Sequence, residues 1–124
     1  MIKILIVDDQ AAVRKGLKMQ LSLEADLLVV GEAENGSQAL EMVPSMKPDV
    51  IILDLEMPVL DGLRTLEKLR KEYPDIGVIM LSIHDYVDDQ LRSKIEGASA
   101  FVVKSGDPSQ LIGEIRRVVD HNIV

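Results

Sequence analysis

Val50-Ile51-Ile52-Leu53 is an unbroken run of large aliphatic residues, and the charged Asp54 ends it. A short apolar run without polar alternation predicts a strand of a parallel sheet that is covered on both faces. Four similar runs occur at residues 4–7, 27–30, 78–81 and 101–103. The sequence therefore predicts five buried parallel strands.

The segments between these runs are amphipathic. Their apolar residues recur at spacings of three and four, which is typical of a helix that turns one face toward the core. In the fourth segment this pattern is formed by Val87, Leu91 and Ile95. The patterns lie at residues 13–21, 37–46, 60–69, 87–95 and 111–119.

A strand followed by a helix, repeated five times, predicts an α/β fold of the (βα)5 type, a three-layer sandwich with right-handed crossovers. The common strand order for such a flavodoxin-like sheet is 2-1-3-4-5, and ligands bind outside the carboxyl ends of strands one and three. We therefore expect a functional site just after Val7 and just after Leu53.

Carboxylates stand at both places: Asp8 and Asp9 follow Val7, and Asp54 follows Leu53. Like charges about 4 Å apart repel by roughly 4 kcal/mol near a protein surface. Such a cluster is stable when one carboxyl is protonated or when a cation neutralises it. Because every available ligand is an oxygen, the cation that fits best is Mg²⁺.

A structural role is the alternative for each carboxylate. Asp8 or Asp9 could cap the helix that begins near Gln10, and Asp54 could cap a turn before residues 57–58. The joint position of the three residues at the predicted ligand edge favours the metal site.

Two further polar residues follow the last two predicted strands, Ser82 and Lys104. A hydroxyl and an ammonium beside a phosphoryl group supply a hydrogen bond and a counter-charge. Taken singly, Ser82 could be a capping hydroxyl and Lys104 a solvated surface lysine. Their positions at successive strand ends favour one shared site.

Asp8-Asp9, the segment 54–62, Ser82 and the segment 101–104 together resemble the response-regulator receiver domains of two-component systems, in order and spacing over essentially the whole chain. The resemblance implies that Asp54 accepts a phosphoryl group from a sensor histidine kinase. It also implies that Asp9, Asp54 and the backbone carbonyl of Glu56 ligate Mg²⁺, and that Asp8 acts through a metal-bound water.

In the same resemblance, Lys104 takes the place of the family's lysine, and Ser82 and Phe101 take the places of its two switch residues. Phosphorylation is then expected to shift the surface formed by the fourth helix, fifth strand and fifth helix. Such a domain is a phospho-accepting signalling domain rather than an enzyme, although it assists its own phosphorylation and dephosphorylation.

Lys104 is followed by Ser105, whereas many receivers have a cis-proline there. Residues 97–105 and 8–10 resemble the NarL/FixJ (LuxR-type) subgroup, whose members usually carry a C-terminal helix-turn-helix domain that binds DNA and regulates transcription. We expect residues 1–124 to be a receiver domain without that output domain, excised rather than stand-alone. The resemblance leaves open whether the protein forms a homodimer on phosphorylation.

Composition restricts the partners of this segment. Fourteen basic and 21 acidic residues give a net charge of −7, which repels nucleic-acid phosphates and anionic lipid surfaces. The chain has no cysteine, and no apolar run approaches the roughly 18 residues of a membrane span. We therefore expect a cytoplasmic protein without direct nucleic-acid or membrane contacts.

Two other classes share part of the pattern. Mg²⁺-dependent phosphohydrolases of the haloacid-dehalogenase type also form a phosphoaspartate. They carry an Asp-x-Asp motif at the nucleophile, whereas this chain has Asp54 and then Glu56. Steady turnover of phosphomonoesters would identify that class.

A flavodoxin-like flavin module would need aromatic stacking, and the two tyrosines and one phenylalanine are not placed for it. Yellow colour on purification would identify a flavin protein.

Overall fold

The computed structural model describes residues 1–57, 61–84, 86–104 and 107–123. Its strands form one parallel sheet in the order β2-β1-β3-β4-β5, which confirms the predicted fold and strand order. The strands are β1 (Ile2–Val7), β2 (Leu27–Ala33), β3 (Val50–Asp54), β4 (Gly77–Ser82) and β5 (Ala100–Val103). The helices are α1 (Ala11–Leu21), α2 (Gly36–Met46), α3 (Gly62–Glu72), α4 (Val87–Ile95) and α5 (Pro108–Ile123).

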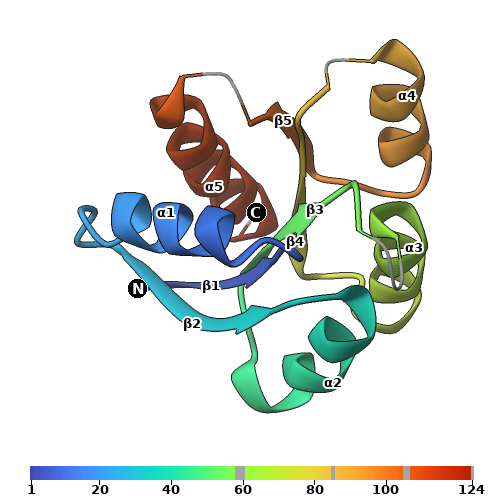
Figure 1. The fold of residues 1–124 in the computed structure, drawn as a ribbon. Helices are drawn as coiled ribbons and strands as arrows, with labels where there is room; N and C mark the ends of the chain where they lie inside the picture. The colour runs from blue at the N-terminus through green and yellow to red at the C-terminus, as the bar shows by residue number, and fades with distance from the viewer. Residues whose placement is uncertain (58–60, 85, 105–106, 124) are drawn as a thin grey trace.

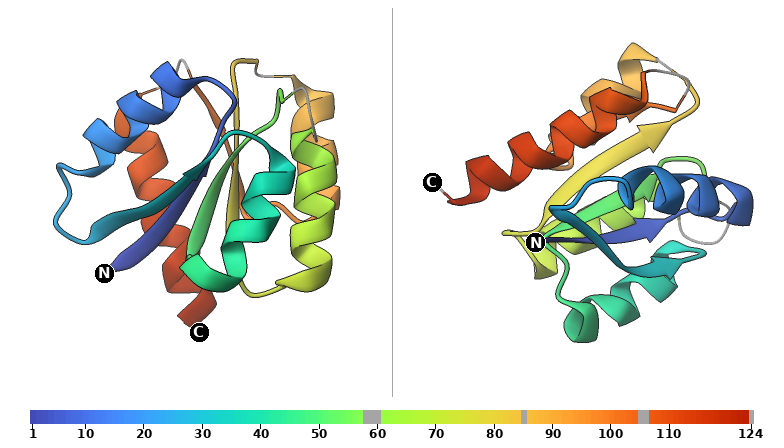
Figure 2. Two further views of the ribbon diagram at one scale, coloured as in Figure 1. Left: turned by 60° about the horizontal axis from the view of Figure 1, so that its bottom comes forward. Right: turned by 90° about the vertical axis from the view of Figure 1, so that its left-hand side faces the viewer.

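The sheet is the middle of three layers. Helices α1 and α5 lie on one face, and α2, α3 and α4 lie on the other (Figures 1 and 2). Successive side chains of a strand point to opposite faces, so each strand contributes to both helix layers. In β1, Leu5 belongs to the cluster that α2 and α3 cover, whereas Ile4 and Ile6 belong to the cluster that α1 and α5 cover. Burial on both faces explains the unbroken apolar runs.

Strand β2 differs from this expectation because it is an edge strand that is only partly covered. It extends to Ala33, three residues beyond the predicted run 27–30. Leu28 is 44% exposed, and Val29 and Val30 are half-buried.

Helix α4 forms where the sequence predicts a helix, but the expected core-facing stripe is wrong. Val87, Leu91 and Ile95 are 68%, 53% and 80% exposed, and the buried residue of the helix is the small Ser93. The reason is the position of α4 beside β5, a four-residue strand at the edge of the sheet, which offers little surface to cover. The apolar stripe of α4 therefore faces outward.

The carboxyl end of α4 is tied to the rest of the domain by Arg70 of α3. The Arg70 guanidinium donates hydrogen bonds to the carbonyls of Ile76 and Gly97 and, at 3.0 Å, to the hydroxyl of Ser99. Gly97 has a φ of +99°, a left-handed conformation that favours glycine. This network fixes the turn between α4 and β5.

Helix α3 begins immediately beside the end of β3. Asp61 caps it by accepting a hydrogen bond from the backbone of Arg64 at 2.8 Å. A Cβ atom on Gly62 would lie 2.4 Å from the carbonyl oxygen of Asp54 and 2.7 Å from the Cα of Leu55. Glycine is therefore required here for the close approach of the helix to the strand end.

Two glycine-to-alanine substitutions are expected to act in opposite directions. Gly62→Ala should destabilise the domain by about 2 kcal/mol, because its Cβ meets backbone atoms that cannot move aside. Gly16→Ala in α1 meets no atom within 4 Å and should stabilise by about 0.5–1 kcal/mol. Urea unfolding of both variants measures the two changes, and equal effects would contradict the close packing of α3 on β3.

Candidate functional site: the carboxylate pocket

The functional side chains lie at the carboxyl edge of the sheet. Asp8 follows β1, whereas Asp54 and Ser82 are the last residues of β3 and β4. Lys104 follows β5. The parallel register aligns these ends, with Val7 opposite Leu53, Asp54 opposite Leu81 and Ser82 opposite Val103. The sheet thus brings together residues that are far apart in the sequence.

Three carboxylates converge as the sequence predicts. Asp8, Asp9 and Asp54 each offer one oxygen, and these oxygens all lie within 4.8 Å of one another. Asp8 and Asp54 are 1% and 2% exposed, whereas Asp9 is exposed to solvent. The cluster therefore has two buried members and one that faces outward.

Lys104 lies between the two buried carboxylates. Its Nζ atom is 3.1 Å from Asp8 Oδ2 and 3.2 Å from Asp54 Oδ1, and its side chain is 16% exposed. The alternative that Lys104 is a solvated surface lysine is therefore wrong. One ammonium cannot neutralise three carboxylates, so the pocket keeps an excess of negative charge.

Part of the structural alternative for the carboxylates is correct. Asp8 Oδ1 accepts a hydrogen bond from the backbone of Gln10 at 2.9 Å, and Asp54 Oδ1 accepts one from the backbone of Glu56 at 3.2 Å. Neither Asp8 nor Asp9 is the N-cap residue of α1, which is Gln10. Asp8 Oδ2, although buried, accepts no hydrogen bond from the described residues. Its contact with Lys104 is an ion pair at 3.1 Å.

Burial and like charge act together on Asp54. Burial, and then the charge of Asp8, raise the pKa of Asp54 to about 7, while Lys104 acts in the opposite direction. Burial would lower the pKa of Lys104, but its interactions with Asp8 and Asp54 outweigh burial and raise it. Lys104 therefore carries its charge at neutral pH.

Ser82 is fully buried and has two partners at the edge of the pocket. Its hydroxyl donates a hydrogen bond to Glu56 Oε1 at 2.6 Å and accepts one from the backbone of His84 at 3.1 Å. The sequence predicted a role only for the Glu56 carbonyl, so this use of its carboxylate was missed. Glu56 lies two residues after Asp54, and this proximity in the sequence is the signal that could have indicated a role for its side chain.

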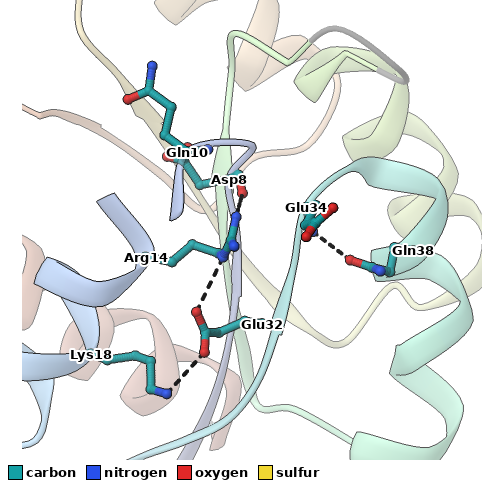
Figure 3. A network of polar contacts seen from close by, with 7 residues as sticks. All are labelled: Asp8, Gln10, Arg14, Lys18, Glu32, Glu34 and Gln38. Atoms are coloured by element: carbon teal, nitrogen blue, oxygen red, sulfur yellow. Dashed lines mark hydrogen bonds and ion pairs between the residues drawn. The ribbon is translucent and has the colours of Figure 1, made fainter. Parts of the chain in front are cut away.

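Arg14 was also missed by sequence analysis, because a charged residue in an amphipathic helix is usually solvated. Its Nη1 atom donates a hydrogen bond to the carbonyl oxygen of Asp8 at 2.7 Å, and its Nε atom donates one to Glu32 at 3.2 Å (Figure 3). Lys18 contacts the same Glu32 carboxylate at 3.0 Å. Arg14 thus connects α1 and β2 to the turn that carries Asp8.

Phe101 lies in β5, on the side of the sheet that α4 covers in part. It is half-buried and packs against the cluster beneath α2 and α3. It also lines a groove of about 380 Å³ between α4 and β5, together with Leu91 and Ser93. Its side chain therefore has open space on one side.

The donors of the pocket fit a hard divalent cation. All three side chains offer carboxylate oxygens, the charge is in excess, and the buried Asp8 Oδ2, apart from its ion pair with Lys104, has no hydrogen-bond partner among the described residues. Mg²⁺ prefers such oxygen ligands and typically keeps coordination positions for water and phosphate oxygens. The residues present are therefore compatible with Mg²⁺.

Comparisons with known proteins agree on one family. The response regulator receiver domain family matches residues 4–116. The protein-glutamate methylesterase/protein-glutamine glutaminase 1 of Carboxydothermus hydrogenoformans is 47% identical over 94% of this chain and 35% of its own length. The nitrate/nitrite response regulator protein NarL of Escherichia coli K12 is 35% identical over 98% of this chain and 56% of its own length. The solved response regulator domain of Thermotoga maritima CheB has a TM-score of 0.89, with 32% identity over 97% of both chains.

The chain spans about a third of the methylesterase and just over half of NarL. Because the methylesterase matches at the higher identity, membership of the NarL/FixJ subgroup stays a prediction. In the part of the chain that the structure describes, no helix is long and apolar enough to cross a membrane.

The raised pKa of Asp54 predicts a pH-dependent stability. Between the ordinary pKa of 3.8 and the folded value of about 7, the folded state binds more protons than the unfolded state. The free energy of unfolding should therefore fall as pH rises through this window. Asp54→Asn removes the titrating group, so above this window it should be more stable than wild type, by on the order of 2 kcal/mol.

Urea unfolding of both proteins in EDTA across this pH range measures the difference. At the acidic end, where wild-type Asp54 is protonated, the two should have similar stability. Parallel pH profiles would contradict the burial of an ionised Asp54.

Proposed function

This chain belongs to the response regulator receiver domain family of two-component systems, and we propose that Asp54 accepts a phosphoryl group from a phosphohistidine of a sensor histidine kinase. The observation that carries this proposal is the position of the Asp54 carboxylate at the end of β3, with Lys104 Nζ at 3.2 Å and two further carboxylates beside it. Receiver domains interact with histidine kinases, so the partner follows from the family.

The transfer forms a bond between an Asp54 oxygen and phosphorus and breaks the bond between phosphorus and the histidine nitrogen. A loose transition state needs positioning and charge neutralisation more than a strong nucleophile. The Lys104 ammonium supplies a positive charge at the attacking carboxylate and opposes the rise in its pKa that burial and Asp8 cause.

Mg²⁺ would be held by Asp9, Asp54 and the Glu56 carbonyl, with Asp8 acting through water, and when bound it would supply the remaining positive charge. The same groups face the acyl phosphate afterwards, so the domain assists both its phosphorylation and its dephosphorylation. It is on this account a signalling domain and not an enzyme with an external product.

Intact mass after incubation with acetyl phosphate and Mg²⁺ tests the acceptor. We expect one phosphoryl adduct on wild type, and none on Asp54→Ala or in EDTA. Asp49→Ala is the matched control, because Asp49 is an exposed aspartate beside β3; it should be labelled normally. Labelling of Asp54→Ala would exclude Asp54 as the acceptor.

We further propose that Ser82 and Phe101 transmit phosphorylation to α4. The Ser82 hydroxyl has one proton to donate, and Glu56 receives it at 2.6 Å. To donate to a phosphoryl group on Asp54, Ser82 must release Glu56 and move, and the groove between α4 and β5 leaves Phe101 space to follow.

The packing of α4 supports this switch. Only Ser93 of α4 is buried, and its hydroxyl accepts or donates no hydrogen bond among the described residues. A helix with few buried contacts is easily displaced. Arg70 holds the turn at its carboxyl end, so a displacement should be largest near Val87 at its amino end, which follows Ser82 in the chain.

Ser82→Ala should separate phosphorylation from the switch. It removes the hydroxyl but no ligand of Mg²⁺, so the adduct on Asp54 should still form. Hydrogen exchange of the α4 amides, which should change on phosphorylation of wild type, should stay unchanged in Ser82→Ala. Phe101→Ala should also reduce the change, whereas Ser45→Ala, an exposed serine in α2, should behave as wild type. A normal response in Ser82→Ala would contradict the role of the hydroxyl.

For the output we propose a DNA-binding helix-turn-helix domain that regulates transcription, as the resemblance to the NarL/FixJ subgroup implies; NarL is among the relatives. The methylesterase match at 47% identity favours a second candidate, in which the receiver controls a catalytic domain. A helix-turn-helix or an esterase domain encoded after residue 124 would distinguish the two. In either case we expect the phosphoryl transfer to take place in the cytoplasm.

The exposed stripe Val87, Leu91 and Ile95 offers an apolar surface on the α4 side of the proposed α4-β5-α5 switch face. We also propose that the protein forms a homodimer on phosphorylation.

A further inference from the structure

Arg14 is a nearly buried cation next to the carboxylate pocket. Its side chain is 12% exposed, although α1 is otherwise largely solvated on this side. Charged groups are rarely buried without partners, and both partners of Arg14 are defined. One is the backbone carbonyl of Asp8, at 2.7 Å, and the other is the carboxylate of Glu32, at 3.2 Å (Figure 3).

The hydrogen bond to Asp8 controls the turn between β1 and α1. The carbonyl of Asp8 and the amide of Asp9 belong to one planar peptide group, so fixing this carbonyl fixes the direction in which the chain enters Asp9. The amide of Asp8 donates to the carbonyl of Ala33 at 3.1 Å, which holds the other side of the residue. Gln10 at the start of α1 makes no side-chain capping bond. Besides the hydrogen bond from the Gln10 backbone to Asp8 Oδ1, Arg14 thus supplies a side-chain link between helix and turn.

Glu32 in turn holds Arg14. It lies on β2 directly before Ala33 and contacts both Arg14 and Lys18. The hydrogen bond from Lys18 is the main cause that lowers the pKa of Glu32, so this carboxylate is ionised at neutral pH. The guanidinium is therefore oriented by β2 and acts on the end of β1.

We propose that Arg14 is a positioning residue for the divalent-cation site. By holding the Asp8 carbonyl, it keeps the exposed Asp9 directed toward Asp8 and Asp54, so that the three carboxylates can share one ion. This inference rests on the proposed Mg²⁺ site, and it assigns a function to a residue that does not itself contact the ion.

Charge and positioning predict opposite effects of removing Arg14. A guanidinium near the pocket repels a cation, so loss of its charge alone should strengthen Mg²⁺ binding. Loss of its hydrogen bond to Asp8 should weaken Mg²⁺ binding, because Asp9 is no longer held in place. The sign of the change therefore distinguishes the two roles.

The experiment measures the Kd for Mg²⁺ by calorimetry on the unphosphorylated chain. Arg14→Gln should weaken binding by about tenfold, the lower range for losing a residue that orients a metal ligand. Lys18→Gln is the matched control, since it removes the same charge from the same Glu32 but does not contact Asp8. It should leave the Kd unchanged or lower it. An Arg14→Gln variant that binds Mg²⁺ as tightly as Lys18→Gln overturns the proposal.

Arg14→Lys keeps the charge and is a second variant for the case that Arg14→Gln does not fold. Thermal unfolding in EDTA shows whether each variant is folded. It should also weaken Mg²⁺ binding, because an ammonium cannot contact Asp8 and Glu32 in the same fork. If Arg14→Gln does not fold, a wild-type Kd for Arg14→Lys overturns the proposal. A wild-type protein that binds no Mg²⁺ overturns the metal site and this inference together, whereas failure of Asp54 labelling with intact Mg²⁺ binding overturns only the phosphoryl acceptor.

Discussion

Asp8 and Asp54 are buried side by side, and the single ammonium of Lys104 lies 3.1 Å and 3.2 Å from them. The rest of the pocket depends on this unequal distribution of charge. Burial, together with the charge of Asp8, leaves Asp54 with a raised pKa, and the buried Asp8 Oδ2 accepts no hydrogen bond from the described residues. Both features are unfavourable for a purely structural site, and both are relieved by a divalent cation. The proposed Mg²⁺ would therefore complete this arrangement.

The backbone around the carboxylates holds them together against their repulsion. Parallel strand ends set the positions of Asp54, Ser82 and Lys104, and Gly62 lets α3 begin directly beside Asp54. Asp8 is held by its own backbone groups, through Ala33 on one side and Arg14 on the other. By contrast, α4, which begins five residues after Ser82, has a single buried residue. A rigid site beside a thinly packed helix is a suitable arrangement for converting a local change of charge into a movement of the surface.

The sequence-based prediction of the site succeeded where residues follow strands. Asp8, Asp9, Asp54, Ser82 and Lys104 could be assembled from the strand order alone, because parallel strands end at one edge. It failed where a contact joins elements through long side chains. Arg14 contacts the Asp8 carbonyl and Glu32, and Glu56 contacts Ser82. These contacts depend on distances between elements, which the hydrophobic pattern of the sequence does not specify. The roles of Ser82 and Phe101 as switch residues remain proposals.

Hydrophobic periodicity by itself determined the five strands and the five helices, and the common order of such folds then predicted the order of the strands in the sheet. It did so because burial on two faces requires unbroken apolar runs, and burial on one face requires a helical stripe. Only the tertiary structure decided which stripes are covered. The stripe of α4 is as regular as that of α1, yet Val87, Leu91 and Ile95 face solvent, because the short edge strand β5 offers little sheet surface for them. Whether an apolar stripe is covered depends on which elements pack against it in the folded domain, and the sequence of the helix alone does not specify those elements.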